Sequence, residues 1–403
     1  MLEKDNKKRL VYLTCGRIPT EKANGYQISK MCEAFAGEGV DVNLFFPYRM
    51  QHNKELKNIT LFEYYSVAPV FTYQQFPILD IFILENILPA KLFGVLLVVY
   101  QYIWTFVAVL FLRITNRYNM YYTRDLPYAL WLSVFRLRNI YEIHSIQKNL
   151  MPKLIRHIGK RARITCITSY LKKEIVAKGV AEEYVAVDPD AVDLKGFEDA
   201  ESKETYRIKY NLPKGYIIGY VGRFNTLGME KGIPELIKSL AILHAQGESS
   251  IYLLCVGGPM EQVVGYKRLA QELKISEDAI IFVDRVPNKE VKEWISSCDV
   301  VTIPWTWNEF SAYYTSPMKM FEYMASGVPI ISSDLPALRD VLTHEKNALL
   351  VEPSNVNALA EAIIRCKDNS GFSMSLAERA KEDVKRYTWE KRAKKILSWY
   401  ESI

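Results

Sequence analysis

The stretch Ser316–Asp334, "SPMKMFEYMASGVPIISSD", decides the fold, and it predicts a loop, a short helix, a loop and a buried strand. Ser316 is a favourable N-cap residue, and Pro317 suits the first helical position. Gly327 and Pro329 end the helix. Side chains at helical spacing predict a core face with a polar face opposite. The core face holds Met320, Phe321, Met324 and Ala325, and the polar face holds Lys319, Glu322 and Tyr323.

The polar side chains of this helix point to a particular ligand chemistry. The free N–H groups at a helix start favour an anion, and Lys319 in the first turn adds positive charge. Glu322, one turn further on, repels phosphate but accepts hydrogen bonds from a diol. The pattern therefore favours a phosphate next to a sugar, as a nucleotide-sugar presents it. An ordinary capped helix with a solvated Lys–Glu pair explains the same residues, and the segment alone does not choose.

The stretch resembles the donor-site signature of GT-B-fold retaining glycosyltransferases of family 4. Many members carry two glutamates eight positions apart, and Glu322 matches the second of them. The first falls at Tyr314, which is not acidic, so the chain is similar to the "SPxKxFEYMAxGxP" branch. This departure leaves open how the sugar ring is held. The resemblance implies that the donor is bound by Ser316, Pro317, Met318, Lys319 and Glu322.

Composition limits the class of protein. The 403 residues are 49% hydrophobic and 24% charged, which is typical of a globular chain with two domains. A net charge of +6 does not by itself require nucleic acid, and no recognition motif accompanies it. The six cysteines are scattered without a C-x-x-C pair, which favours reduced, buried thiols in a cytosolic protein. The start of the chain does not resemble a signal peptide, so we expect a cytoplasmic location.

The first half of the chain alternates strand and helix. Strands are expected over Leu10–Cys15 and Val40–Phe46, with a polar loop and a helix over about Ile28–Ala36 between them. This order opens a doubly wound sheet, in which ligands bind beyond the carboxyl ends of the strands. The resemblance implies that the first loop contacts the donor phosphates, with Gly25 as its closing glycine. For Gly16, a simple tight turn is the favoured explanation.

Two further polar motifs follow in this half. His144 ends the strand in "YEIHS", where a doubly wound fold places its site. A lone histidine is more often structural, but the resemblance implies a catalytic role for His144 at the donor sugar. Asp188 and Asp190 form a D-P-D string that suits a divalent metal. Because the segment resembles the family's exit from the first domain, we interpret it as structural and predict neither a metal nor another cofactor.

The second half, from Tyr216, repeats the strand and helix alternation. Its first loop, "GRFNTLGMEKG", places Arg223 and Lys231 eight positions apart before a helix start, which suits a diphosphate. The resemblance implies that both stabilise the leaving diphosphate. It also places Arg285 near the nucleotide base.

Leu92–Leu112 is 21 residues long and carries no formal charge. Its length and hydropathy suit a transmembrane helix. A single crossing would, however, separate strands that we expect in one sheet. Three interpretations stay open: a helix embedded in one leaflet without crossing, a fully buried core helix, or a true span. Its aromatic residues favour the first, and residues 76–115 are predicted to associate with the membrane.

Residues 148–173 contain no Asp or Glu and many basic side chains. Leu150, Leu154, Ile155 and Ile158 recur among them at helical spacing. This pattern predicts a basic amphipathic helix at an anionic membrane surface. The alternative is an ordinary solvated face with an apolar stripe toward the core.

The chain is thus expected to form an α/β GT-B fold of two Rossmann-like domains facing a cleft. An acceptor-side domain covers 1–197, a linker 198–214, a donor domain 215–385, and a returning helix 386–403. The resemblance implies a metal-independent retaining glycosyltransferase using a nucleotide-diphosphate sugar. The acceptor is expected to be a lipid-linked or membrane-proximal glycan, at the inner face of the cell membrane. A nucleotide-sugar epimerase, a soluble-acceptor transferase and a non-catalytic sugar-nucleotide-binding scaffold remain as alternatives.

Overall fold

The computed structural model describes residues 8–51, 53, 56–146, 151–226 and 228–401. The chain divides into two compact units. The first unit comprises 1–189 together with 389–403, and the second comprises 190–388. Residues 190–214, expected partly in the first domain and partly as a linker, therefore cluster with the second unit. Arg207 ties this segment there through an ion pair of 2.5 Å with Asp299.

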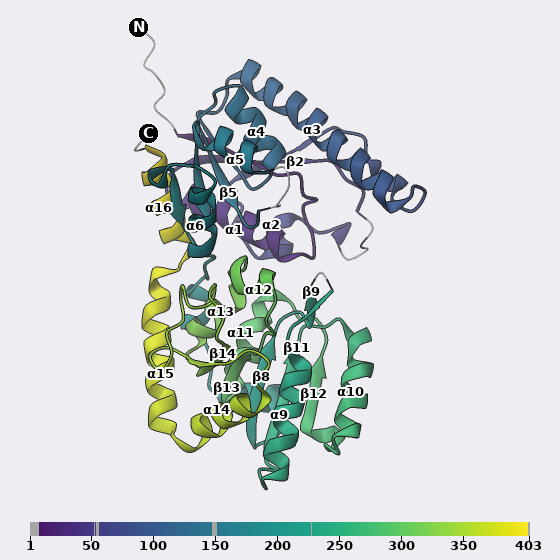
Figure 1. Ribbon diagram of the computed structural model, residues 1–403, viewed down its shortest axis with the longest axis vertical. Helices are drawn as coiled ribbons and strands as arrows, with labels where there is room; N and C mark the ends of the chain where they lie inside the picture. The colour runs from purple at the N-terminus through teal and green to yellow at the C-terminus, as the bar shows by residue number, and fades with distance from the viewer. Residues whose placement is uncertain (1–7, 52, 54–55, 147–150, 227, 402–403) are drawn as a thin grey trace. The chain divides into compact units, whose positions relative to one another are not determined.

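The first unit contains a seven-stranded parallel sheet in the order β3-β2-β1-β4-β5-β6-β7 (Figure 1). Its strand order reverses between β1 and β4, which pair directly. The elements are β1 Arg9–Leu13, α1 Ala23–Gly37, β2 Asp41–Pro47, α2 Leu61–Tyr65, β3 Thr72–Phe76, the 3-10 helix η2 Ile81–Leu84, α3 Ala90–Thr115, β4 Met120–Thr123, α4 Leu126–Val134, β5 Asn139–Ile143, α5 Met151–Gly159, β6 Ala162–Cys166, α6 Ser169–Ala177, η3 Glu182–Tyr184, β7 Val185–Val187 and α16 Trp389–Glu401.

The second unit contains a six-stranded parallel sheet in the order β12-β11-β8-β13-β14-β15. Helices cover both of its faces, so its strands are continuous apolar runs. The elements are α7 Lys195–Glu198, α8 Lys203–Lys209, β8 Tyr216–Val221, β9 Asn225–Thr226, β10 Met229–Glu230, α9 Ile233–Ala245, β11 Ile251–Val256, η4 Met260–Gln262, α10 Val263–Glu272, η5 Glu277–Ala279, β12 Ile280–Val283, α11 Asn288–Ser296, β13 Val300–Ile303, α12 Glu309–Tyr313, α13 Met318–Ser326, β14 Ile330–Ser333, β15 Leu349–Val351, α14 Val356–Asp368, α15 Ser370–Asp383 and η6 Val384–Arg386.

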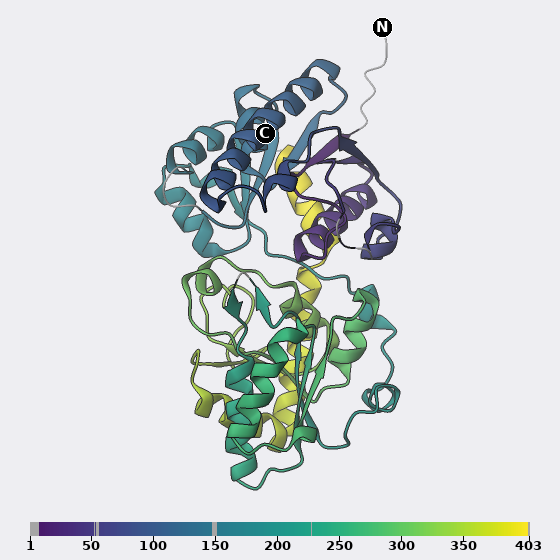
Figure 2. The same cartoon turned by 90° about the vertical axis from the view of Figure 1, so that its right-hand side faces the viewer.

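The helix α16 belongs to the first unit although it follows the whole second unit in sequence. In Figure 2 it is the yellow helix beside the purple α1, which it contacts. All six cysteines are buried and none forms a disulfide, as the scattered spacing predicts.

The helix α1 begins at Ala23, five residues before the predicted start, so Gly25 lies in its first turn and not in a loop. A Cβ atom on Gly25 would overlap the Tyr65 hydroxyl, which bonds both the N–H and the C=O of Thr20 at 2.7 and 2.8 Å. The glycine at this position is therefore explained by close packing against α2.

The helix α3 is neither fully buried nor placed to cross a membrane. Its Trp104, Ala108 and Leu112 pack into the core of the first unit. The opposite face is apolar and exposed, and Figure 1 shows one end of the helix projecting from the unit. The buried-core interpretation is therefore wrong. A single crossing is also excluded, because β1 before the helix pairs with β4 after it in one sheet.

The helix α5 corrects the prediction for 148–173. Ile155 and Ile158 are fully buried, so the apolar stripe faces the core and does not enter a membrane. The exposed face is basic, with Lys153, Arg156 and Lys160. Lys148 and Leu150 lie outside the described residues.

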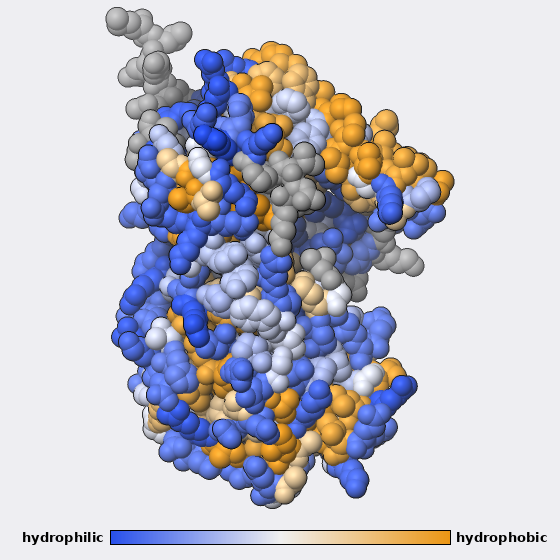
Figure 3. All heavy atoms as spheres, in the orientation of Figure 1, coloured by the Kyte–Doolittle hydropathy of each residue, from blue (hydrophilic) through white to orange (hydrophobic). Residues whose placement is uncertain are grey.

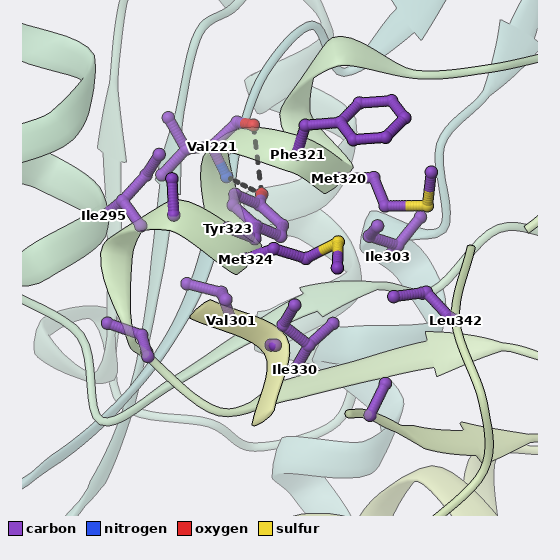
Figure 4. Close-up of a cluster of buried hydrophobic side chains, with 14 of the residues drawn as sticks. Val221, Ile295, Val301, Ile303, Met320, Phe321, Tyr323, Met324, Ile330 and Leu342 are labelled. Carbon is purple, nitrogen blue, oxygen red and sulfur yellow. Dashed lines mark hydrogen bonds between the residues drawn. The ribbon is translucent and has the colours of Figure 1, made fainter. Parts of the chain in front are cut away.

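The helix α13 corrects two predictions made from its sequence. Its N-cap is Pro317, without a side-chain cap, and Ser316 instead accepts a hydrogen bond of 2.9 Å from the Asp190 N–H. Tyr323, assigned to the polar face, is fully buried. Its hydroxyl accepts from the Val221 N–H at 2.8 Å and donates to the Val221 C=O at 3.0 Å (Figure 4). This double hydrogen bond fixes α13 to the end of β8.

We expect Tyr323→Phe to lower the free energy of unfolding by about 1–3 kcal/mol, because both backbone groups of Val221 lose a buried partner. Urea unfolding measures the change. Tyr252→Phe is the matched control, since Tyr252 has no hydroxyl hydrogen bond to any described residue, and its effect should stay within about 0.5 kcal/mol. Equal effects of the two variants would contradict the assigned role of the Tyr323 hydroxyl.

Candidate functional site

The second unit gathers several of the predicted donor residues where its strand order reverses, whereas Gly25 belongs to the first unit and Arg285 follows the edge strand β12. The chain leaves β8 at Gly222 and leaves β13 at Pro304, and these strands are neighbours. Doubly wound sheets bind ligands at this position. Gly222 has φ +144°, and a Cβ atom there would overlap the Lys319 ammonium group. A glycine at this strand end is therefore needed for the close approach of Lys319.

Lys319 is a cation in an unusual environment. Its Nζ atom is buried and has no hydrogen-bond acceptor among the described residues. It lies 3.9 Å from the centre of the Tyr220 ring. Burial lowers the pKa of Lys319 to about 7, and the nearby charge of Lys231 acts in the same direction. An ammonium group that is buried and unpaired has a strong preference for an anionic ligand.

Lys231 approaches the same site from the loop before α9. Its side chain is 6% exposed, and its Nζ lies 4.6 Å from the centre of the Trp305 ring. Burial lowers the pKa of Lys231. The adjacent Glu230 does not neutralise it through an ion pair, because its carboxylate accepts hydrogen bonds from the Gly232 and Ile233 N–H groups at the start of α9.

Arg223 follows Gly222 in the same loop, and its side chain is exposed. Among the described residues it has no ion-pair partner within 4.0 Å, so its guanidinium is available to a ligand. Arg285 follows β12, also at a carboxyl strand end, and is exposed.

The Glu322 carboxylate is the hydrogen-bond acceptor of this site. It is half-buried one turn after Lys319 on α13, and the described part of the chain gives its carboxylate no hydrogen-bond donor. Burial raises the pKa of Glu322 to about 7, while Lys319 opposes the shift. Neutral hydroxyl donors satisfy such a carboxylate without competing with the anion site.

The start of α13 completes the anion site. With Pro317 as N-cap and no side-chain cap, the N–H groups of Met318 and Lys319 are left to a ligand or water, whereas the Met320 N–H donates to the Pro317 C=O at 2.9 Å. Ser316 points elsewhere, since its hydroxyl serves the Asp190 N–H. The second unit thus brings together Lys231, Lys319 and Glu322, with Arg223 on the same loop as Lys231.

His144 belongs to the first unit, where it is held by Glu142. The His144 Nε2 lies 2.5 Å from the Glu142 Oε1, and the Nδ1 lies 3.0 Å from the Arg124 Nη2. Glu142 is fully buried and also contacts Arg392 of α16 at 3.0 Å and the Gln27 amide of α1 at 2.7 Å. This arrangement fixes the orientation of the imidazole ring at the end of β5.

The partners of Glu142 set its charge. Burial alone would raise the pKa of Glu142, but Arg392, His144 and Arg124 together hold it well below its usual value. The sequence carried one signal for this network, because positions 142 and 144 face the same side of one strand. Nothing local could point to Arg392, which lies 250 residues further on.

In the D-P-D string, the first carboxylate, that of Asp188, has a structural role. Asp188 accepts a hydrogen bond of 2.7 Å from Thr165 and pairs with Lys395 of α16 at 2.5 Å. Asp188 and Asp190 belong to different units. Among the described residues, no group of three or more His, Cys, Asp or Glu side chains is placed to hold a metal ion.

We expect Lys319→Met to stabilise the fold by about 1–3 kcal/mol, because it removes a buried ammonium without an acceptor. The folded pKa near 7 is lower than the unfolded value of about 10.4, so wild-type stability rises with pH between them. The gain of the variant should be largest below pH 7 and shrink above it. Thermal unfolding at several pH values measures this.

The exposed Lys238 of α9 is the control for this prediction, and Lys238→Met should change stability by less than about 0.5 kcal/mol. If Lys319→Met destabilises the protein, the ammonium group makes favourable interactions within the fold and does not need a ligand to stabilise it.

Part of the second unit matches a known protein family. Residues 215–369 match the family described as "Glycosyl transferases group 1". A D-inositol 3-phosphate glycosyltransferase of Corynebacterium urealyticum is 27% identical over 227 residues, covering 54% of this chain and 51% of that protein. The chain thus spans about half the length of this curated relative.

Two solved structures resemble the whole chain. Sucrose-phosphate synthase of Thermosynechococcus elongatus has a TM-score of 0.71 at 19% identity, over 98% of this chain and 99% of the other. Anabaena HepE in complex with UDP-glucose has a TM-score of 0.69 at 15% identity, over 98% and 100%. At such identities the likeness concerns the fold. The chain therefore has the GT-B fold of two Rossmann-like units, and its residues 215–369 are similar to glycosyl transferases group 1.

Proposed function

We propose that this protein is a glycosyltransferase that uses a nucleotide-diphosphate sugar as donor. The observation that carries the proposal is the pair of side chains on α13 that lack partners in the described chain. The buried Lys319 ammonium needs an anion, and the Glu322 carboxylate beside it needs hydroxyl donors. A diphosphate joined to a ribose supplies both groups at adjacent positions. The match of residues 215–369 to glycosyl transferases group 1 supports this proposal.

In the proposed reaction, the bond between the sugar and the diphosphate breaks, and negative charge develops on the leaving diphosphate. Arg223, Lys231 and Lys319 would stabilise this charge, aided by the N–H groups at the start of α13. These fixed cations would take the role that a divalent metal has in other transferases. Glu322 would accept hydrogen bonds from the ribose hydroxyls, and Arg285 would contact the base.

His144 would orient the transferred sugar, with its ring held by Glu142. We propose a retaining outcome, in which the acceptor attacks the same face of the sugar that the diphosphate leaves. The HepE structure contains UDP-glucose, which supports a nucleotide-diphosphate sugar of this kind as the donor.

We further propose that the protein attaches peripherally to the inner face of the cell membrane through α3. The exposed face of this helix carries Val95, Val99 and Ile103 at four-residue spacing, 64%, 50% and 58% exposed. Figure 3 shows the apolar side chains gathered along this helix. The helix has a mean hydropathy of 2.2 over its most apolar window. The occupant that suits a long, uncharged face is the interior of a lipid leaflet.

The acceptor is then proposed to be a lipid-linked or membrane-proximal glycan, used in the assembly of surface polysaccharide or glycoconjugate. The exposed basic face of α5 would add electrostatic attraction to anionic lipids. It would do so without inserting, because its apolar residues are in the core.

We expect Arg223→Ala to lower the rate of sugar transfer roughly 100- to 1,000-fold, because it removes one cation from the developing charge. Lys231→Met should act similarly while preserving packing against Trp305. Transfer of radiolabelled sugar from the donor measures the rate, and the donor is first found by thermal shift with a panel of nucleotide-sugars. A ligand at 100 times its Kd should stabilise the protein by about 2.7 kcal/mol.

Lys238→Ala is the control for these variants and should keep the wild-type rate. Wild-type rates for Arg223→Ala and Lys231→Met would remove the phosphate assignment. Excess EDTA should leave the rate of sugar transfer unchanged. Loss of transfer in EDTA would mean that the reaction needs a metal ion. Conversion of the donor without an acceptor would indicate an epimerase, and donor binding without any turnover would indicate a scaffold.

We expect the wild-type protein to float with phospholipid vesicles, and the combined variant Val95→Glu, Val99→Glu, Ile103→Glu to stay in solution. Burial of each apolar side chain contributes about 1.5 kcal/mol or more, so the partition coefficient should fall roughly 1,000-fold. Ile208→Glu, Val264→Glu and Met374→Glu together form the control, because these exposed apolar residues lie in the second unit. A concentration-dependent dimer that the α3 variant disrupts, without flotation, would assign the face to a second copy.

A further inference from the structure

A pocket of about 650 Å³ opens in the first unit, and its described lining includes none of the residues assigned above to the donor. One side is formed by the loop between β1 and α1, including Arg17 and Lys22. Arg49, which follows β2, also lines the pocket. The other side is the segment 80–86 that leads into α3. The pocket thus lies at the carboxyl ends of β1 and β2.

The wall that leads into α3 is firmly held. The Asp80 carboxylate accepts from the Met50 N–H at 2.8 Å and from the Phe82 N–H at 3.2 Å. Phe82 packs edge-on against Phe93 of α3, with ring centres 5.7 Å apart. The hydroxyl of Tyr100 on α3 donates to the C=O of residue 79. The pocket wall and α3 therefore form one packed body.

Three residues that line the pocket carry polar groups whose hydrogen bonding or charge is incompletely satisfied by the described residues. Arg49 donates to the Cys15 C=O at 3.0 Å and lies 4.2 Å from the centre of the Phe82 ring, but no described carboxylate pairs with it within 4.0 Å. Arg17 pairs with Glu21 at 3.1 Å, yet its Nε is buried without an acceptor. The buried Asn24 Oδ1 likewise has no donor. Burying a polar group without a hydrogen-bond partner costs free energy, and a bound ligand that supplies the partner removes this cost.

The ligand chemistry follows from these groups. Arg49 and the exposed Lys22, which makes no ion pair with a described residue, suit a phosphate. The Asn24 carbonyl and the Glu85 carboxylate, also lining the pocket, suit sugar hydroxyls. The interior therefore matches a sugar phosphate.

The pocket edge has the opposite character. Ile83 lines the pocket and is 57% exposed. Leu79 and Ile87, four residues to either side in the sequence, are still more exposed, and the same segment leads into α3, whose exposed face is apolar. A polar pocket that opens beside such a surface fits an amphipathic molecule, whose head enters the pocket and whose chain stays on the apolar face.

We infer that this pocket binds the sugar-phosphate head of a lipid-linked acceptor, with the lipid chain lying over Ile83 and the exposed face of α3. The inference rests on the proposed function and deepens it, because it names the acceptor class and its site. A soluble sugar phosphate has the same head chemistry. We commit to the lipid-linked form because a soluble ligand leaves the apolar edge unexplained.

The test is transfer of labelled sugar to two acceptor pools from the source cells. One pool is total membrane lipid in phosphatidylcholine vesicles, and the other is the water-soluble extract. Wild-type protein should label an organic-soluble product. Lys22→Gln with Arg49→Gln should lower kcat/KM for the vesicle pool about tenfold or more, while the donor thermal shift stays unchanged. Lys22→Gln alone removes only an exposed side chain, so it tests the site even where the double variant folds poorly.

Two variants make the outcome specific. Lys57→Gln removes an exposed charge outside the pocket and should match the wild type. Ile83→Asp should impair use of the vesicle pool. Wild-type kinetics in the pocket variants, or label only in water-soluble products, would overturn the inference. Donor binding with no organic-soluble product would also overturn it. Absence of a donor thermal shift in the wild type would instead remove the proposed function itself.

Discussion

A charge taken out of water must find a partner, and the two units meet this constraint in opposite ways. In the first unit the buried Glu142 carboxylate is surrounded by Arg392, His144 and Gln27, so its charge is stabilised within the fold. In the second unit Lys319 is buried without an acceptor. The Glu142 network joins several elements of the first unit. The unpaired Lys319 ammonium favours the binding of an anionic ligand. The difference separates structural from functional polar groups in this chain.

Because both sheets are parallel, the loops at one edge of each carry the functional side chains. Alternating strands and helices are enough to predict this edge, and the local pattern of α13 is enough to predict Lys319 and Glu322 as its polar residues. The environment of those residues was not predictable. The Tyr220 ring near Lys319 comes from β8, and the Trp305 ring near Lys231 comes from the loop after β13. Their contacts depend on tertiary packing.

The wrong predictions have physical causes. Ser316 has the chemistry of an N-cap, but a tertiary hydrogen bond to the Asp190 N–H uses its hydroxyl. The hydroxyl of Tyr323 predicts a position on the polar face of α13. Its ring is instead buried, and its hydroxyl forms hydrogen bonds with the backbone of Val221. The basic pattern of α5 cannot distinguish a core from a leaflet as the environment of its apolar stripe. For α3, only the pairing of β1 with β4 decides against a single crossing.

The position of Arg392 has a consequence for biosynthesis. The helix α16 completes the first unit, yet the ribosome must make all of residues 190–388 before it makes α16. Until then Glu142 lacks its ion pair with Arg392, and α1 lacks its contact with α16. Domains generally fold in the order of their synthesis, but here the unit that starts first is finished after the second. A chain truncated anywhere in the second unit therefore keeps Glu142 and Arg124 beside His144 but lacks Arg392, the ion-pair partner of the buried Glu142.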